Sequence, residues 1–261
     1  MPAFEAMEGM PYWQDLATTD TQKSTYFYSR VLGWEVSADA YRVARKDGLP
    51  VAGFIPQLDD PTMTDGWVTY FLTRDPVRDR GNVEKLGGTV LASAEVSLGE
   101  MSLCVDPAGA VFGLIAPAGE DQFVAAGEPG TPVWHEYVAV SRGRECIDFY
   151  AELFDWEVRV DDGYYTALRD GAPFLGMRDE SGRDELEGMA GFWETYLGVA
   201  DTAAAARRAE ELGGELLLGP EQHPFGLLAV IADPTGATVT LCEVEEPSYE
   251  EYNEADSILD L

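Results

Sequence analysis

Two stretches, FYSRVLGWEV at residues 27–36 and FYAELFDWEV at residues 149–158, decide the fold because they are two copies of one pattern. The same order of motifs continues around them: PYWQDL matches PVWHEY, WVTYFL matches WETYLG, and DPAGAVFGL matches DPTGATVTL. All six tryptophans pair between the copies, at separations of 121, 122 and 126 residues. A repeat of this kind, about 110 residues long, predicts two homologous domains in tandem.

The boundaries follow from the ends of the matching motifs. We expect the first domain over residues 1–117 and the second over residues 132–246. Residues 118–131 are rich in Gly, Pro and acids without periodicity, which is typical of a linker. Residues 247–261 form an acidic tail whose only candidates for packing are Tyr249, Tyr252, Ile258 and Leu259.

Composition bounds the class of protein. The chain has 261 residues, 46% of them hydrophobic, which is enough for a globular core. Its net charge of −31, with 17 basic residues, argues against nucleic acid as a partner, because phosphate binding requires a basic surface. The acidity has two readings: a solvated acidic surface, or a field that draws a cationic ligand into a cleft. Neither a membrane-spanning run nor a signal peptide is apparent, so we expect a cytoplasmic protein with no membrane partner. The three cysteines lack disulfide or zinc spacing and are expected to be reduced.

Each repeat contains the same run of elements twice. In the first repeat, WQDLATTD is strand-like, a helix follows over TQKSTYFYSRVLG behind Asp20 or Thr21, and YRVARKDG with PVAGFIPQ predicts a hairpin. The cycle then restarts with strand WVTYFLT, helix PVRDRGNVEKLGG and three further strands. The helix at DTAAAARRAEELGG in the second repeat, with Asp201 or Thr202 as its N-cap, is the stronger helix former. Each repeat therefore predicts two βαβββ modules.

This twin βαβββ pattern, with FY in the first helix, LGW after it and a DPxG turn before the last strand, resembles the vicinal oxygen chelate superfamily over residues 9–246. That superfamily includes glyoxalase I, bleomycin- and fosfomycin-resistance proteins and extradiol dioxygenases. The tandem form is similar to an actinobacterial two-domain group described as glyoxalase-like or hydroxylase proteins. The resemblance implies an α+β fold of two glyoxalase-like domains, in which each pair of modules forms a U-shaped, eight-stranded mixed sheet with helices on its convex face. It also implies a ligand cavity on the concave face.

In metal-using members of that superfamily, His, Glu or Gln ligands come from the first and last strands of the modules. Laid on this chain, those positions hold residues that bind metals poorly, with Glu194 the one good candidate; they are Trp13, Ala52 or Gly53, Val68, Gly113, Trp134, Leu175 or Gly176, Glu194 and Thr240. His135 follows Trp134 by one residue, and successive strand side chains point to opposite faces, so we expect it on the other face unless the register shifts. His223 lies in a turn and is interpreted as a surface residue. We therefore expect no cofactor and no metal, a divalent metal being the less favoured alternative.

The positions expected to face the cavities carry aromatic and acidic side chains instead. The candidate ligand-binding residues are Trp13, Asp15 and Tyr70 in the first domain and Trp134 and Tyr196 in the second, with Glu136 and Glu194 as a coupled carboxylate pair able to perform general acid–base catalysis. Such a lining suits an aromatic or cationic small molecule. The alternative for these residues is an ordinary core or local hydrogen bonding, and that is our interpretation of Phe27, Tyr28, Trp34, Phe149, Tyr150 and Trp156, which show core spacing.

Three functional hypotheses stay open at this point. The first is a metal-independent protein that binds or sequesters an aromatic or cationic metabolite or antibiotic. The second is an enzyme: either a metal-dependent lyase, isomerase or oxygenase, or a cofactor-free tailoring enzyme that uses Glu136 and Glu194. The third is a scaffold whose cavities have collapsed around their own tryptophans. The expected partner is a small molecule, and the chain is expected to be a monomer or a homodimer.

Overall fold

The computed structural model describes residues 3–5, 7–57, 64–119 and 123–246. The expected tail over residues 247–261, with its four candidate packing residues, lies outside this described part. Within it, the elements follow the order that the repeat predicts, and each half forms one eight-stranded mixed sheet.

The first sheet comes from the first repeat. Its strands are β2 (Pro11–Thr18), β3 (Glu35–Val36), β4 (Arg42–Lys46), β5 (Leu49–Pro56), β6 (Gly66–Leu72), β7 (Thr89–Val96), β8 (Gly99–Val105) and β9 (Val111–Pro117). They lie in the order β3-β4-β5-β2-β6-β9-β8-β7. Strands β2 and β5 pair in parallel, as do β6 and β9, whereas the other neighbours are antiparallel.

The second sheet repeats this arrangement. Its strands are β11 (Pro132–Ala139), β12 (Glu157–Asp161), β13 (Tyr164–Arg169), β14 (Ala172–Asp179), β15 (Phe192–Val199), β16 (Glu215–His223), β17 (Gly226–Ala232) and β18 (Thr238–Glu243). Their order, β12-β13-β14-β11-β15-β18-β17-β16, is equivalent strand by strand to that of the first sheet. Even the register is shared, since Trp13 faces Tyr70 across one central pair and Trp134 faces Tyr196 across the other. The α+β fold of two tandem domains is confirmed.

Four helices link the strands: α1 (Thr21–Val31), α2 (Pro76–Lys85), α3 (Gly143–Phe154) and α4 (Thr202–Glu211). Asp20 and Asp201 cap α1 and α4 by accepting bonds from the backbone N–H groups three residues later. A short 3-10 turn covers Asp184–Leu186. No helix among the described residues is long and apolar enough to cross a membrane.

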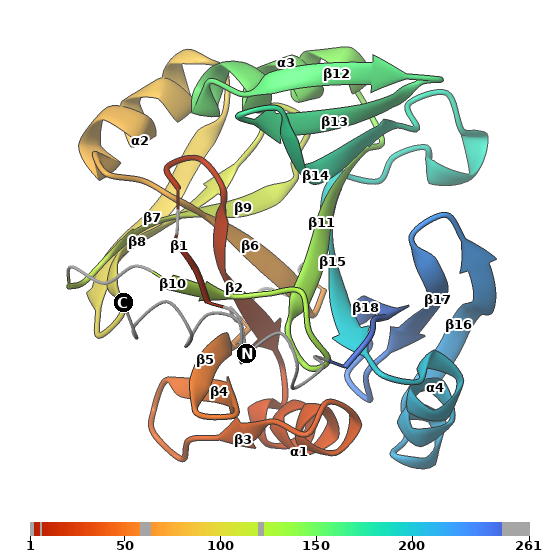
Figure 1. Ribbon diagram of the computed structural model, residues 1–261. Coiled ribbons are helices and arrows are strands. Elements are labelled where there is room, and N and C mark those ends of the chain that lie inside the picture. Colours follow the sequence, from red (N-terminus) through yellow and green to blue (C-terminus); the bar gives the residue numbers. More distant parts are fainter. Residues whose placement is uncertain (1–2, 6, 58–63, 120–122, 247–261) are drawn as a thin grey trace, which may run out of the picture.

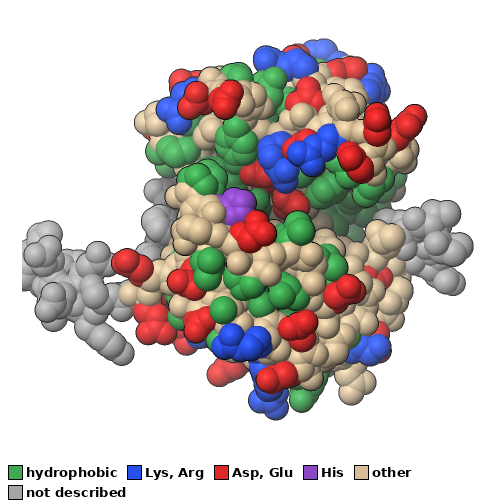
Figure 2. Space-filling view, turned by 90° about the vertical axis from the view of Figure 1, so that its right-hand side faces the viewer, with side chains coloured by type: hydrophobic (Ala, Val, Ile, Leu, Met, Phe, Trp, Pro, Cys, Tyr) green, Lys and Arg blue, Asp and Glu red, His purple; other side chains and the backbone are tan. Residues whose placement is uncertain are grey.

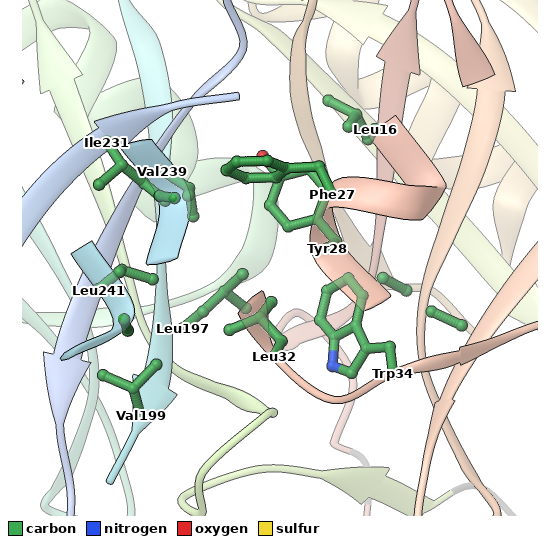
Figure 3. Packing of buried hydrophobic residues seen from close by; sticks show 14 of the residues in the cluster. Leu16, Phe27, Tyr28, Leu32, Trp34, Leu197, Val199, Ile231, Val239 and Leu241 are labelled. Atoms are coloured by element: carbon green, nitrogen blue, oxygen red, sulfur yellow. The ribbon is translucent and has the colours of Figure 1, made fainter. Parts of the chain in front are cut away.

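The two halves pack through their helix-bearing faces. Figure 1 shows the sheets back to back, with α1 and α4 together on one side and α2 and α3 together on the other. One core joins Phe27, Tyr28 and Trp34 of the first repeat to residues of α4 and of the second sheet such as Leu197 and Ile231 (Figure 3). A second core joins side chains such as Phe71 and Phe112 to α3. Each core therefore draws on both repeats, and the six aromatic residues interpreted as core are buried.

The repeated tryptophans after α1 and α3 also tie the halves together. Trp34 Nε1 donates to the carbonyl oxygen of Gly130 at 2.7 Å, and Trp156 Nε1 donates to that of Gly9, also at 2.7 Å. The segment between the repeats contains a short strand that the sequence did not indicate, β10 (Phe123–Ala125), which pairs with β1 (Ala3–Glu5). Because the helices and both cores occupy the inner faces, the opposite faces of the two sheets are free to form sites.

Candidate functional site

The central strands of the second sheet place the predicted site residues on its outer face. Trp134 and Glu136 lie on β11, directly opposite Tyr196 and Glu194 on β15. Directly paired residues on one face of an antiparallel pair have neighbouring side chains, so these four predicted residues come together. Val138 follows on the same face, and the alternate residues of β11, His135 and Tyr137, point to the opposite side.

An arginine that the sequence analysis missed lies between the two carboxylates. Arg178 on β14 bonds Glu136 through Nε and Glu194 through Nη2, the latter at 3.0 Å, and its Nη1 lies 3.2 Å from Glu180. Glu136 also accepts a 2.6 Å bond from the Tyr164 hydroxyl. Glu136 is buried, whereas the side chain of Arg178 is 36% exposed. Glu136 and Glu194 are therefore bridged by a guanidinium.

This cluster sets the protonation behaviour of its members. Burial raises the pKa of Glu194, as does the charge of Glu136, while Arg178 opposes the shift. Burial acts to lower the pKa of Arg178, but the charges of Glu136 and Glu194 and the hydrogen bond to Glu136 together have the larger effect and raise it above its usual value, so Arg178 stays a cation. Three carboxylates meet two guanidinium groups here, because Arg183 also pairs with Glu180 at 2.6 Å, which leaves a formal excess of one negative charge. Glu194, partly exposed and harder to ionise than an ordinary glutamate, is the group best suited to exchange a proton.

An aromatic pair lies beside the charged cluster. The ring of Phe225, in the β16–β17 turn, stacks on Trp134 with 6.2 Å between centroids and 21° between planes. Phe225 is 64% exposed, which is unusual for so large an apolar side chain. Figure 2 shows this side of the molecule, where acidic side chains lie in a hollow beneath Lys or Arg side chains. His223, at the end of β16, is exposed as expected of a surface residue.

The equivalent face of the first sheet is closed. Trp13 Nε1 donates to Asp15 at 2.9 Å and to the Tyr41 hydroxyl at 2.8 Å, and Tyr41 donates to Asp15 at 2.6 Å. Trp13, Asp15 and Tyr70, all predicted as ligand-binding residues, are 7%, 2% and 4% exposed. Burial raises the pKa of Asp15 to about 6, against the hydrogen bonds from Tyr41 and Trp13 that lower it. The structure brings the predicted residues together here, but it surrounds them with apolar side chains such as Met101.

On the outer face of each sheet, a tyrosine that the sequence analysis missed lies over a glycine of the next strand. Tyr41 and Tyr164 lie at the same position of the two repeats, each on the strand edge beside a glycine of the next strand. A Cβ atom on Gly53 would come within 2.2 Å of the Tyr41 hydroxyl, and one on Gly176 within 1.8 Å of the Tyr164 hydroxyl. The signal was present: AYRVARKDGLPVAGF aligns with GYYTALRDGAPFLGM without a gap. That alignment also places Arg178 opposite Ile55, so the arginine belongs to the second repeat alone.

The residues present do not fit the divalent metal that the superfamily resemblance implies. Among the positions that would supply ligands in the second repeat, Glu194 is already paired with Arg178, and the other three hold Trp134, Leu175 or Gly176, and Thr240. In the part of the chain that the structure describes, no group of three or more His, Cys, Asp or Glu residues has the geometry to hold a metal ion. Arg178 already bonds both carboxylates of this pair, so a metal ion would have to displace it.

His135 lies on the opposite face from Trp134, as the strand alternation predicts. It is 8% exposed, its Nδ1 lies 3.3 Å from the Thr69 hydroxyl of the first repeat, and burial lowers its pKa to about 4. It therefore belongs to the junction of the two repeats. Its counterpart in the first repeat, Gln14, is buried at the same junction.

Comparison with known proteins assigns both repeats. Residues 133–241 match the family model described as the Glyoxalase/Bleomycin resistance protein/Dioxygenase superfamily, and residues 14–115 match that of a glyoxalase-like domain. The anthracycline biosynthesis protein DnrV of Streptomyces peucetius is 30% identical over 263 residues, which cover 91% of this chain and 94% of DnrV.

Two solved structures share the fold. The Mn(II)-bound glyoxalase from Novosphingobium aromaticivorans has a TM-score of 0.63 and 17% identity, covering 93% of this chain and 85% of its own. The 2,3-dioxygenase LapB from Pseudomonas sp. KL28 has a TM-score of 0.61 and 13% identity, covering 94% of this chain and 96% of its own. At these identities the likeness establishes the fold.

Proposed function

Because the chain belongs to the glyoxalase/bleomycin resistance protein/dioxygenase superfamily, we propose that its second repeat uses the outer face of its sheet to bind an aromatic, cationic small molecule without a metal. The observation that carries this proposal is the exposed Phe225 stacked on Trp134 beside the Glu136–Arg178–Glu194 cluster. Phe225 is the phenylalanine among the exposed large apolar side chains of the described residues, and its position on Trp134 beside charged groups leaves an aromatic surface that a ligand could cover.

The aromatic part of the ligand is expected to stack on Trp134 and Phe225. Stacked aromatic pairs contribute about 0.5–1.5 kcal/mol beyond the area that they bury. The turn that carries Phe225 joins two strands at the edge of the sheet, so its ring can move to admit a planar ligand. DnrV is named for anthracycline biosynthesis, and anthracyclines combine a planar ring system with an amine, which makes daunorubicin a suitable probe.

The cationic part of the ligand is supported by the charge balance of the site. Glu136, Glu180 and Glu194 are balanced by two guanidinium groups, Arg178 and the Arg183 that pairs with Glu180, and the chain as a whole carries −31. An amine would therefore be attracted to Glu194, the more exposed of the two carboxylates on the central strands. Tight binding of this kind would allow the protein to sequester a toxic metabolite or antibiotic.

Daunorubicin titrations followed by quenching of tryptophan fluorescence test the proposal. We expect saturable binding that Phe225→Ala weakens about five-fold, as the loss of about 1 kcal/mol of stacking implies. Tyr26→Ala removes another exposed aromatic ring, on α1 in the first repeat, and should leave the affinity unchanged. EDTA should have no effect. Absence of saturable binding, equal effects of the two variants, or loss of binding with EDTA would each overturn the proposal.

A second function, cofactor-free catalysis on the bound molecule, is favoured by one observation: the raised pKa of the partly exposed Glu194 beside a fixed cation. A protonated Glu194 can donate a proton to a ligand oxygen, and its carboxylate can accept one. Glu194→Gln should then abolish turnover, while binding becomes weaker but stays saturable, because Trp134 and Phe225 still stack on the ligand. Glu180→Gln, which alters another carboxylate on the same arginine, is the matched control and should retain turnover. Full turnover in Glu194→Gln would refute the catalytic role and leave the binding role intact.

A further inference from the structure

A cavity of about 230 Å³ lies between the two repeats, apart from the charged cluster on the outer face of the second sheet. Its walls come from the first residues of β2 and β11, from β5 and β14, and from the segment after β10. Most of the lining is apolar, as Pro11, Val51, Pro132 and Phe174 illustrate. Trp13 and Trp134 also line it, so the tryptophans have not closed every space around themselves.

The cavity wall contains two polar side chains that occupy the same position in the two repeats, Gln14 and His135. Gln14 is 1% exposed; its Nε2 donates to the Val51 carbonyl at 3.3 Å, and its Oε1 has no hydrogen-bond partner among the described residues. His135 is 8% exposed, and its Nδ1 lies 3.3 Å from the Thr69 hydroxyl.

Buried polar atoms of native proteins are nearly always paired, and one left unpaired costs about 1–3 kcal/mol. One such atom, Gln14 Oε1, in the wall of an apolar cavity points to a bound partner that supplies the missing bond. Gln14 Oε1 accepts, so its partner must carry an O–H or N–H group. A neutral imidazole has one donor and one acceptor nitrogen, so His135 Nε2 can serve a hydroxyl in either tautomer.

The described residues that line the cavity include no Asp, Glu, Lys or Arg, although the chain carries 48 acidic and 17 basic residues. A charged ligand would lose its hydration here without gaining an opposite charge. The volume lies below the range of about 300–1,000 Å³ that holds drug-sized molecules, which limits the ligand to one or two rings.

We propose that this junction cavity is a second binding site, which takes a small neutral aromatic molecule with one hydroxyl or N–H group that bonds Gln14 or His135. The site differs from the one proposed on the outer face of the second sheet, although Trp134 borders both. Phenol and indole fit this description, and toluene is the matching ring without a donor.

The chain holds only two histidines, which gives the test an internal control. We would titrate phenol into the full-length protein and follow the imidazole signals by two-dimensional NMR. The resonances of buried His135 should shift and saturate, and those of exposed His223 should stay fixed. Toluene should bind at least five-fold more weakly. No shift of His135, equal shifts of both histidines, or equal binding of toluene would overturn the proposal.

A cavity-filling variant gives a second measurement. Ala126 lines the cavity just outside β10, so Ala126→Phe should weaken phenol binding at least ten-fold. Ala190→Phe, at an exposed position away from the cavity, should bind phenol like the wild type. Phe225→Ala should also leave phenol binding unchanged, which separates this site from the daunorubicin site. Undiminished phenol binding in Ala126→Phe would contradict the assignment.

Discussion

Asp15→Asn should stabilise the protein at neutral pH and leave its stability unchanged in acid. Asp15 is 2% exposed, and burial raises the pKa of its carboxyl from 3.8 to about 6. A carboxyl whose pKa is raised on folding favours the folded state fully below the unfolded pKa, and that contribution is lost as the pH rises through the folded pKa. The relevant window is therefore pH 4 to 6.

The magnitude follows from the same two pKa values. Each pKa unit corresponds to about 1.4 kcal/mol, so ionising Asp15 in the folded state costs about 3 kcal/mol relative to the unfolded chain. Asparagine has nearly the same shape, and its carbonyl oxygen can still accept the bonds from Tyr41 and Trp13. The variant avoids the ionisation, so it should exceed the wild type by about 3 kcal/mol at pH 8 and match it near pH 3.5.

Urea unfolding followed by tryptophan fluorescence, repeated from pH 3.5 to 8, would measure this difference. The remaining carboxylates titrate in both proteins, so the difference between the two curves isolates Asp15. Asp162→Asn removes an exposed carboxylate at a turn, and its unfolding free energy should differ from that of the wild type by the same amount at every pH. Parallel curves for the wild type and Asp15→Asn, or a less stable variant at pH 8, would refute the reasoning.

Three further predictions concern other buried groups. Burial lowers the pKa of His135 from 6.5 to about 4, so the folded state is favoured fully above pH 6.5 and loses that advantage as the pH falls to 4. Relative to His135→Gln, the wild type should therefore lose about 3 kcal/mol of unfolding free energy between pH 6.5 and 4. No such loss would contradict the prediction. Gly176→Ala should destabilise by about 1–3 kcal/mol because Tyr164 occupies the space, whereas Gly66→Ala meets nothing within 4 Å; equal melting temperatures for the two variants would count against the crowding argument. Cys104 and Cys146 are buried with pKa values raised to about 12 and about 11, so Ellman's reagent should label them only after unfolding; rapid labelling of the native protein would disprove their burial.

Strand periodicity and the repeat predicted two tandem domains of βαβββ modules and the side on which His135 lies, and the resemblance to the vicinal oxygen chelate superfamily implied how the modules form a sheet. The alignment of PVWHEY with PYWQDL showed that tryptophan and an acid are the shared residues, and both pairs do occupy the outer faces of their sheets. These predictions succeed because alternation along one strand is a local property of the sequence. The helix caps at Asp20 and Asp201 are equally local.

The arginine between the glutamates could not be predicted in this way. Arg178 reaches Glu136 because β14 and β11 pair in parallel, and that pairing brings together residues 42 positions apart in the chain. The residue aligned with Arg178 in the first repeat is Ile55, which does not indicate a charged residue at this position. The aligned positions of Asp15 and Glu136 also could not predict that Asp15 is enclosed by neutral side chains whereas Glu136 pairs with an arginine. This difference depends on what surrounds each acid: Val68 in one repeat, Glu194 and Arg178 in the other.

The sharing of both cores between the repeats has a consequence for the evolution of this chain. A core that takes α1 from one copy and α4 from the other leaves neither copy able to bury its own apolar surface alone. Duplication therefore created partners, and selection for solubility then acts on the pair. The first repeat, whose outer face is closed, can then specialise in supporting the fold, while the second repeat, whose outer face is open, can change its chemistry. We expect the first repeat to be retained because the second repeat packs α4 and its sheet against it.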